Sequence, residues 1–182
     1  MIDLHSHILP GMDDGSASVE QSISMLLSAA AQGVTTVVAT PHFYPRHDSP
    51  ERFLTRRARA EAILREEMAK YDDLPKLSLG AEVYFFQGIS DSDEIQALTI
   101  DKTGCILLEM LGSPWTDSMY HEIEQLRAKQ GLIPLIAHVD RYIGPLRTYG
   151  IPDRLAELPV LVQANASFFL RTATRGMAMR LL

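Results

Sequence analysis

Segments typical of buried strands alternate with segments typical of amphipathic helices along almost the whole chain of 182 residues. The clearest strand lies within 34–42, a continuous β-branched run that is ended by Pro41. The clearest helix is 17–33, where apolar residues recur at helical spacing before Gly33. Further strands are predicted at 2–7, 76–85, 105–111, 132–138 and 159–166, and further helices at 50–70 and 116–131. This alternation predicts an α/β protein whose mostly parallel sheet is covered by helices and is either open or curled into a barrel.

Composition narrows the class of protein further. We expect a single domain over 1–182, because the sequence shows no internal repeat and no linker. A net charge of -6 argues against a nucleic-acid-binding surface. No apolar run approaches the roughly 18 residues of a membrane helix, and the N-terminus lacks the features of a signal peptide. We therefore expect a cytoplasmic protein that does not insert into membranes.

Imidazole and carboxylate side chains stand at or just after the ends of five predicted strands. These residues are His5, His7, His42, Glu82, Glu109 and His138. The carboxyl ends of parallel strands meet on one face, so we expect the side chains to gather there. His5 and His7 are two residues apart on one strand and therefore point to the same side. Asp13 and Asp14 follow on the next loop, where the sequence Asp-Asp-Gly is also a good turn sequence.

Taken singly, each of these residues has a structural explanation, such as a hydrogen-bonded histidine or a carboxylate paired with an arginine. Burying so many ionisable groups together without compensation is very unfavourable, and divalent cations supply that compensation. A mixed set of histidine and carboxylate ligands suits zinc, manganese or iron better than calcium or magnesium. The six residues at strand ends and one aspartate of the loop make seven candidate ligands, which are too many for one ion, so we expect a cluster of two or more.

The chain resembles the PHP superfamily over essentially its whole length. The resemblance is carried by the motifs HSHILPGMDDG, ATPHF, GAEVYF, LLEM and IAHVDRY. The opening MIDLHSHILPGMDDG resembles one branch in particular, the bacterial metal-dependent protein-tyrosine phosphatases of capsule and exopolysaccharide loci. This resemblance implies a distorted, TIM-like α/β barrel with outer helices. It also implies a site of two or three metal ions, with manganese expected and iron or zinc as alternatives.

The resemblance also implies roles for individual residues. The metal ligands would be His5, His7, Asp14, His42, Glu82, Glu109 and His138. Arg141 would hold the phosphate, although a salt bridge to Asp140 or a contact with a helix end would explain it equally well. Asp13 would orient its loop, and Tyr44 and Arg46 are candidates for substrate contact.

Members of the family extend beyond the position of Leu182 and complete the site with an Asp-x-His motif on a late strand. No such motif follows the strand predicted at 159–166. Relative to the family, the chain is therefore expected to be truncated at its C-terminus, to lack the closing strand or strands, and to have impaired activity.

The resulting hypothesis is a metal-dependent protein-tyrosine phosphatase. Its expected partner is a phosphotyrosine protein, namely the C-terminal tyrosine cluster of a polysaccharide-export kinase, and a homo-oligomer is compatible with the resemblance. Two alternatives stay open: a small-molecule phosphatase of the histidinol phosphate type, and a catalytically silent metal-binding domain. A cysteine-dependent phosphatase is disfavoured, because Cys105 lies within a predicted strand and residue 111, where such an enzyme has arginine, is leucine.

Overall fold

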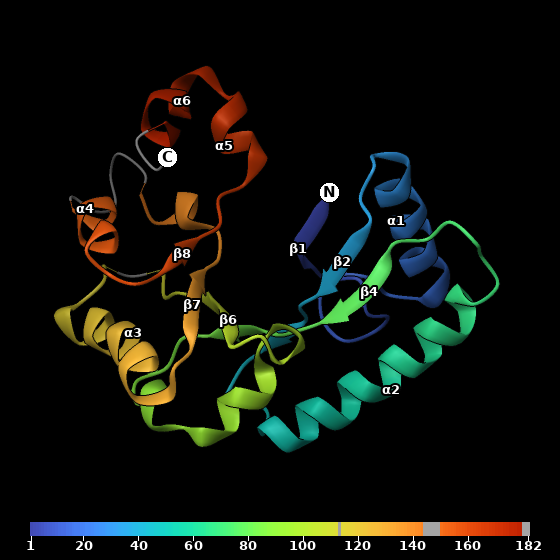
Figure 1. The fold of residues 1–182 in the computed structure, drawn as a ribbon, viewed down its shortest axis with the longest axis horizontal. Coiled ribbons are helices and arrows are strands. Elements are labelled where there is room, and N and C mark those ends of the chain that lie inside the picture. The colour runs from blue at the N-terminus through green and yellow to red at the C-terminus, as the bar shows by residue number, and fades with distance from the viewer. Residues whose placement is uncertain (113, 144–149, 180–182) are drawn as a thin grey trace. The chain divides into compact units, whose positions relative to one another are not determined.

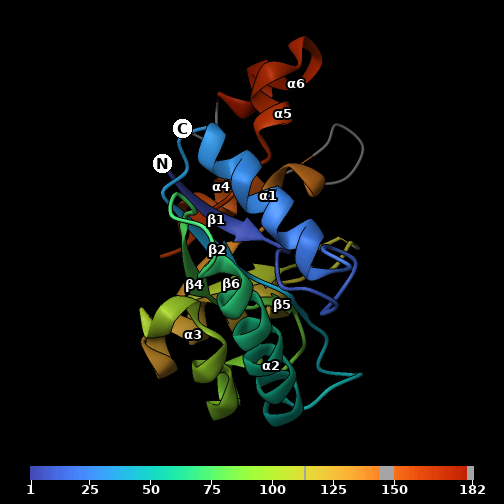
Figure 2. The ribbon, with the colours of Figure 1, turned by 90° about the vertical axis from the view of Figure 1, so that its right-hand side faces the viewer.

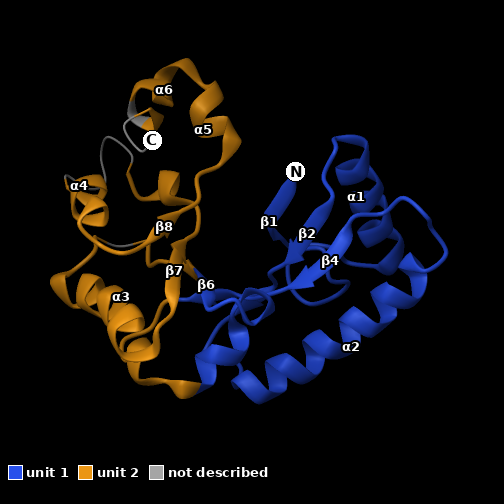
Figure 3. Ribbon diagram, viewed as in Figure 1, with its two compact units in different colours: residues 1–84, 94–107 blue, residues 85–93, 108–182 orange. Residues whose placement is uncertain are grey.

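The computed structural model describes residues 1–112, 114–143 and 150–179. Figure 1 shows the order of the elements, and Figure 3 shows that the chain divides into two compact units. Unit 1 contains residues 1–84 and 94–107, and unit 2 contains residues 85–93 and the described residues from 108 onward. The prediction of one domain over 1–182 stays a prediction.

Unit 1 is built on a three-stranded parallel sheet with the order β1-β2-β4. The strands are β1 (Ile2–Ser6), β2 (Thr36–Ala39) and β4 (Lys76–Leu79). Helices α1 (Val19–Ala31) and α2 (Pro50–Met68) lie beside this sheet (Figures 1 and 2). The core joins both layers and includes Ile23, Leu26, Val37, Ala39, Ala60, Leu64 and Leu77. The apolar periodicity that predicts the two helices therefore marks the faces that they bury.

The predicted strand 76–85 is wrong as one element, because the structure divides it into β4 and β5 (Glu82–Tyr84). After β4 the chain leaves the first sheet, and β5 pairs with β3 (His42–Phe43), with His42 opposite Glu82. The break lies at Gly80, where an added Cβ would stand 3.1 Å from Ile100 Cγ1. The absence of a side chain thus lets the backbone pass close to Ile100 as it changes sheets. Pro41 similarly separates β2 from β3.

In unit 2, β7 (Ile133–Ile136) pairs in parallel with β8 (Leu161–Val162). Strand β6 (Cys105–Glu109) begins in unit 1, and its last two residues belong to unit 2. The helices are α3 (Asp117–Gln130), α4 (Ile151–Ala156), α5 (Ala166–Leu170) and α6 (Thr172–Ala178). The α/β class with parallel strands is confirmed, and closure into a barrel stays a prediction. Helix α4 was not predicted, nor were the short 3₁₀ helices at Ile89–Asp91, Asp93–Leu98, Ile100–Lys102 and Val139–Arg141.

None of the described helices combines the length and the apolar character needed to cross a membrane.

A buried carboxylate anchors the segment 85–93 to α3. Glu122 is only 6% exposed and accepts hydrogen bonds from Gln87 Nε2 at 2.7 Å and from the backbone N–H groups of Gly88 and Ser90 at 3.0 Å. Burial alone would raise the pKa of Glu122, but the hydrogen bonds from Ser90 and Gly88 outweigh it and lower the pKa below its usual value. The ionised carboxylate is therefore the form that stabilises unit 2.

Replacing Glu122 with Gln should lower the free energy of unfolding at neutral pH by about 1–3 kcal/mol, because buried N–H donors would then face an amide. The lowered pKa in the folded state means that the carboxylate's contribution is complete above the unfolded-state pKa of about 4.3. It is lost as the pH falls below that value through the folded-state pKa. Urea unfolding at a series of pH values should show that the difference in free energy of unfolding between the variant and the wild type disappears in acid. Glu124→Gln, at an exposed position on the same helix, should change the free energy of unfolding little. A difference between the Glu122 variant and the wild type that does not depend on pH would contradict the role given to the ionised carboxylate.

Candidate metal centre

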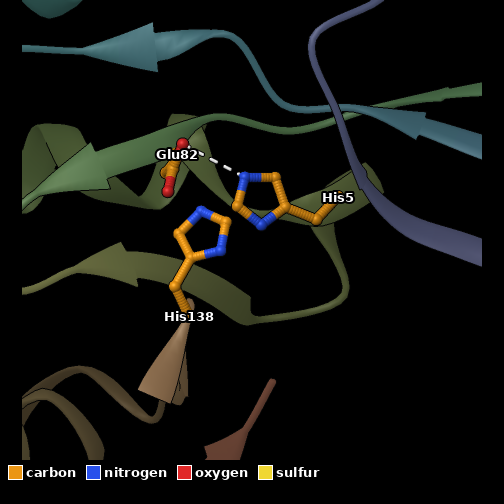
Figure 4. Close-up of side chains that lie close together, drawn as sticks. All are labelled: His5, Glu82 and His138. Atoms are coloured by element: carbon orange, nitrogen blue, oxygen red, sulfur yellow. Dashed lines mark ion pairs between the residues drawn. The ribbon is translucent and has the colours of Figure 1, made fainter. Parts of the chain in front are cut away.

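Three histidine side chains of unit 1 converge on one carboxylate oxygen. His5 Nε2, His7 Nε2 and His42 Nδ1 each lie 3.1 Å from Glu82 Oε2. The Glu82 side chain is fully buried, and the three imidazoles are at most 21% exposed. Figure 4 shows the pair formed by His5 and Glu82. Four side chains from three strands and one loop thus meet at one point within a single unit.

Local structure explains this convergence. His5 lies on β1 and His7 directly follows that strand, and their Nε2 atoms are 3.2 Å apart. His42 and Glu82 each begin a short strand, and the two residues face each other in the register of β3 with β5. Glu82 is therefore the first residue of a strand, whereas the sequence analysis placed it at a strand end.

The arrangement fits a divalent transition metal. At metal–ligand distances of about 2.0–2.1 Å, neighbouring ligand atoms stand about 3.0 Å apart in an octahedron and about 3.4 Å apart in a tetrahedron. The separations of 3.1–3.2 Å between these nitrogen and oxygen atoms fall in that range. Imidazole together with carboxylate is also a ligand set that such metals prefer. A second group of potential ligand atoms, from His7, Asp13 and Asp14, lies within 4.8 Å of one another.

Asp13 supports the candidate metal centre through hydrogen bonds with residues of the centre and of its own loop. Its Oδ2 lies 2.7 Å from His7 Nδ1 and accepts the backbone N–H of His42 at 2.9 Å, while Oδ1 accepts the N–H of Gly15 at 3.0 Å. Burial opposes a charge on His7, but hydrogen bonds with Asp13 and Glu82 outweigh it and raise its pKa to about 10. In this geometry Nδ1 is the nitrogen that faces Asp13, and Nε2 is the nitrogen directed at Glu82. The sequence suggested only that Asp13 orients its loop.

The loop that carries Asp13 and Asp14 depends on Gly15. A Cβ at this position would lie 2.2 Å from the carbonyl oxygen of His7, so no other residue fits without movement. Asp14 itself is 84% exposed, with Oδ1 3.6 Å from His42 Nε2. Asp14 is thus placed on the solvent side of His42, where it can reach an ion without holding the fold together.

The other predicted metal ligands, Glu109 and His138, and the predicted phosphate-binding residue Arg141 belong to unit 2. Glu109 is the last residue of β6, and its Oε1 lies 3.4 Å from Arg141 Nη1. Asp140, a suggested partner for Arg141, instead accepts both the backbone and the side-chain N–H of Asn165, at 2.8 and 3.0 Å. The contact of Arg141 with Glu109 was not foreseen, and the arginine remains 54% exposed.

His138 adopts a strained backbone conformation. Its φ of +48° lies in the left-handed region, which is uncommon for residues other than glycine. Its backbone N–H donates to Gln163 Oε1 at 2.8 Å, and the next residue, Val139, donates to the Gln163 carbonyl at 2.9 Å. Strain of this kind persists where surrounding contacts impose it and is concentrated at functional sites.

A cavity of about 590 Å³ in unit 1 adjoins the centre. Its walls are formed by Met12, Asp13, Asp14, His42, Tyr44, His47, Asp48, Arg52 and Arg56. Tyr44 thus lines the cavity as a substrate contact would, whereas Arg46 is exposed and is not among the lining residues. The roles of both residues stay predictions. Nothing in the sequence indicates that Arg52 and Arg56 line a cavity, because charged residues at helical spacing are typical of any solvated helix face.

Residues 1–180 match the family model described as capsular polysaccharide synthesis, CpsB/CapC. The chain belongs to the CpsB/CapC family. Over 146 residues it is 32% identical to the tyrosine-protein phosphatase YwqE of Bacillus subtilis, covering 78% of this chain and 55% of that protein. Over 174 residues it is 28% identical to the tyrosine-protein phosphatase CpsB of Streptococcus agalactiae, covering 94% of this chain and 70% of the relative.

A solved structure gives the same family relationship. It comes from work on YwqE from Bacillus subtilis and CpsB from Streptococcus pneumoniae, described as unique metal-dependent tyrosine phosphatases. The match has a TM-score of 0.83 at 26% identity and covers all of this chain and 74% of the other. This CpsB/CapC chain thus spans little more than half of YwqE in sequence and about three quarters of the structural relative.

Replacing Asp13 with Asn should weaken metal binding by about 10- to 100-fold, the usual effect of losing the carboxylate behind a histidine ligand. Metal content after dialysis against graded concentrations of a chelator, measured by mass spectrometry, reports the change. Asp72→Asn removes the same charge from an exposed position of unit 1 and should leave binding unaltered. Equal retention of metal by the Asp13 variant and the wild type would show that Asp13 has no part in the centre.

Proposed function

We propose that this chain is a manganese-dependent phosphomonoesterase that hydrolyses phosphotyrosine in proteins. The observation that carries the proposal is the convergence of three imidazole nitrogens on the buried Glu82 oxygen in a member of the CpsB/CapC family. The names of the relatives, which are tyrosine-protein phosphatases, support the reaction class. On the resemblance, Asp14, Glu109 and His138 complete a set of ligands for two or three ions.

The residues of the chain would divide the work of hydrolysis. When bound, divalent ions lower the pKa of water and offset the negative charge of the phosphate. The residues that would hold the bound ions are His5, His7, His42 and Glu82. Asp13 would fix the proton of His7 on the nitrogen turned away from Glu82. Placement of this kind lowers the barrier because the groups need no reorganisation during the reaction.

Arg141 would bind the non-bridging phosphate oxygens. Its guanidinium is half exposed, and the only ion pair seen for it among the described residues is the 3.4 Å contact with Glu109. Donor groups in a planar fork can therefore reach a substrate anion and match two of its oxygens. Tyr44, and more distantly Arg46, would contact the substrate around the phosphate.

The proposed physiological substrate is the C-terminal tyrosine cluster of a polysaccharide-export kinase. The family's link with capsular polysaccharide synthesis supports this choice. A cytoplasmic location and a homo-oligomeric state belong to the same proposal.

Removing the central carboxylate tests the proposal directly. Glu82→Gln should lose bound metal and reduce hydrolysis of a phosphotyrosyl peptide by more than the roughly 10- to 100-fold typical of changes behind the ligands. Metal content and activity would be measured with added Mn²⁺, with Glu124→Gln as a control for the chemical change. Full activity in the Glu82 variant, or faster turnover of histidinol phosphate than of the peptide by the wild type, would contradict the proposal.

Arg141 provides a separate test of phosphate recognition. Arg141→Ala should lower kcat/KM for aryl phosphates by about 10- to 100-fold, since hydrogen bonds to charged groups contribute about 1.5–3 kcal/mol. Arg141→Lys should recover only part of the loss, because an ammonium group cannot reproduce the bidentate geometry. Metal content should be unchanged in both. If the variants lose metal or unfold instead, the arginine acts through Glu109 and not on the substrate.

A further inference from the structure

The cavity beside the centre has two chemically different ends. One end is formed by Asp13, Asp14 and His42, which belong to the candidate metal centre. The other is formed by Asp48, Arg52 and Arg56, from the start of α2 and the loop before it. A volume of about 590 Å³ is in the range of about 300–1,000 Å³ seen for ligand sites. The cavity therefore has room for more than the reacting phosphate group.

The α2 end carries an excess of positive charge. Arg56 Nη2 lies 2.6 Å from Asp48 Oδ2, whereas Arg52 Nε is 3.6 Å from Asp48 Oδ1, beyond hydrogen-bond distance. The Arg52 side chain is 77% exposed and that of Asp48 only 10%. Two guanidinium groups thus face one carboxylate, which is already bonded to Arg56. Arg52 is the cation that can turn to an incoming anion.

An aromatic surface connects the two ends. The Tyr44 ring stacks on His42 at 5.1 Å between centroids and 25° between planes, and it contacts His47 edge-on at 6.4 Å. A phenyl ring whose phosphate lies at the His42 end can pack along Tyr44. The groups attached to that ring would then extend toward Arg52.

We infer that this cavity selects phosphotyrosyl peptides with an anionic group beside the phosphotyrosine, and that Arg52 binds that anion. The inference rests on the proposed function and names its substrate class more closely. The anion can be the carboxylate of a flanking acidic residue or the phosphate of a neighbouring phosphotyrosine, which present the same chemistry to a guanidinium. Asp13 is paired with His7, and both aspartates belong to a group of potential metal ligands, so an ion bound there would offset their negative charge.

Binding, and not turnover, is the direct test. Three labelled peptides would carry a hydrolysis-resistant phosphonate in place of phosphotyrosine and differ only in the flanking residues: glutamate, a second phosphonotyrosine or glutamine. Their Kd values for the full chain with Mn²⁺ would be measured by fluorescence anisotropy. An exposed ion pair is a modest interaction, so we expect either anionic peptide to bind about two- to fivefold more tightly than the glutamine peptide. Added salt should reduce this preference.

Two variants assign the preference to one side chain. Arg52→Gln should bring the Kd values of the anionic and glutamine peptides together. Arg59→Gln removes the same charge from the same face of α2, two turns later and outside the set of described lining residues, and should keep the preference. The glutamate and phosphonotyrosine peptides show which anion is the preferred source.

The outcomes separate the inference from the proposed function. Equal Kd values for the three peptides with the wild type, or an undiminished preference in the Arg52 variant, would overturn the inference. Hydrolysis of p-nitrophenyl phosphate by the wild type is measured in parallel and tests the phosphatase activity alone. A protein that prefers the anionic peptides but hydrolyses no phosphate monoester would retain the Arg52 site and refute the proposed function.

Discussion

The buried carboxylate of Glu82 is the constraint around which unit 1 is organised. A carboxylate with no exposed surface needs partners that offset its charge, and three imidazoles at 3.1 Å provide the contacts. To place them there, the chain must end β1 just before His7, divide the segment 76–85 at Gly80 and start β3 and β5 in register. The same contacts would be unfavourable in a site that bound nothing, because the imidazoles would have to carry protons close to one another. The geometry is that of a site arranged for a cation.

The sequence predicted the residue types of the centre better than their geometry. Alternating strand and helix patterns located β1, α1, β2, α2 and α3, because the helices have a readable apolar period and β2 is a continuous β-branched run. The division of 76–85 could not be read in this way. It depends on a close approach between Gly80 and Ile100, which are distant in sequence. The 3₁₀ helices and α4 are short and carry no clear apolar period, so the pattern gave no signal for them.

The residues that support the ligands were the hardest to predict. Asp13 reads equally well as part of a turn, and only the structure shows one carboxylate joining the His7 ring to the His42 backbone. Gln163 likewise has no feature in the sequence that marks it as the partner of the strained His138 backbone. Such roles arise from contacts between segments far apart in the chain, and a local pattern contains no information about them. Arg52 is a further case, since charged residues on a helix usually face only solvent.

The bonds made by Asp13 would also link the binding of an ion at the proposed centre to the folding of unit 1. One carboxylate joins the loop at 13–15 to the His7 side chain and to the first residue of β3, so the same side chain links these three segments. An unfolded chain offers no comparable set of ligands, and the free energy of binding is therefore added to the folding of unit 1. At an ion concentration 100 times the Kd, this addition is about 2.7 kcal/mol, a large share of the stability of an ordinary domain. Metal bound at the proposed centre would then contribute to the stability of unit 1 in addition to any chemistry that it supplies.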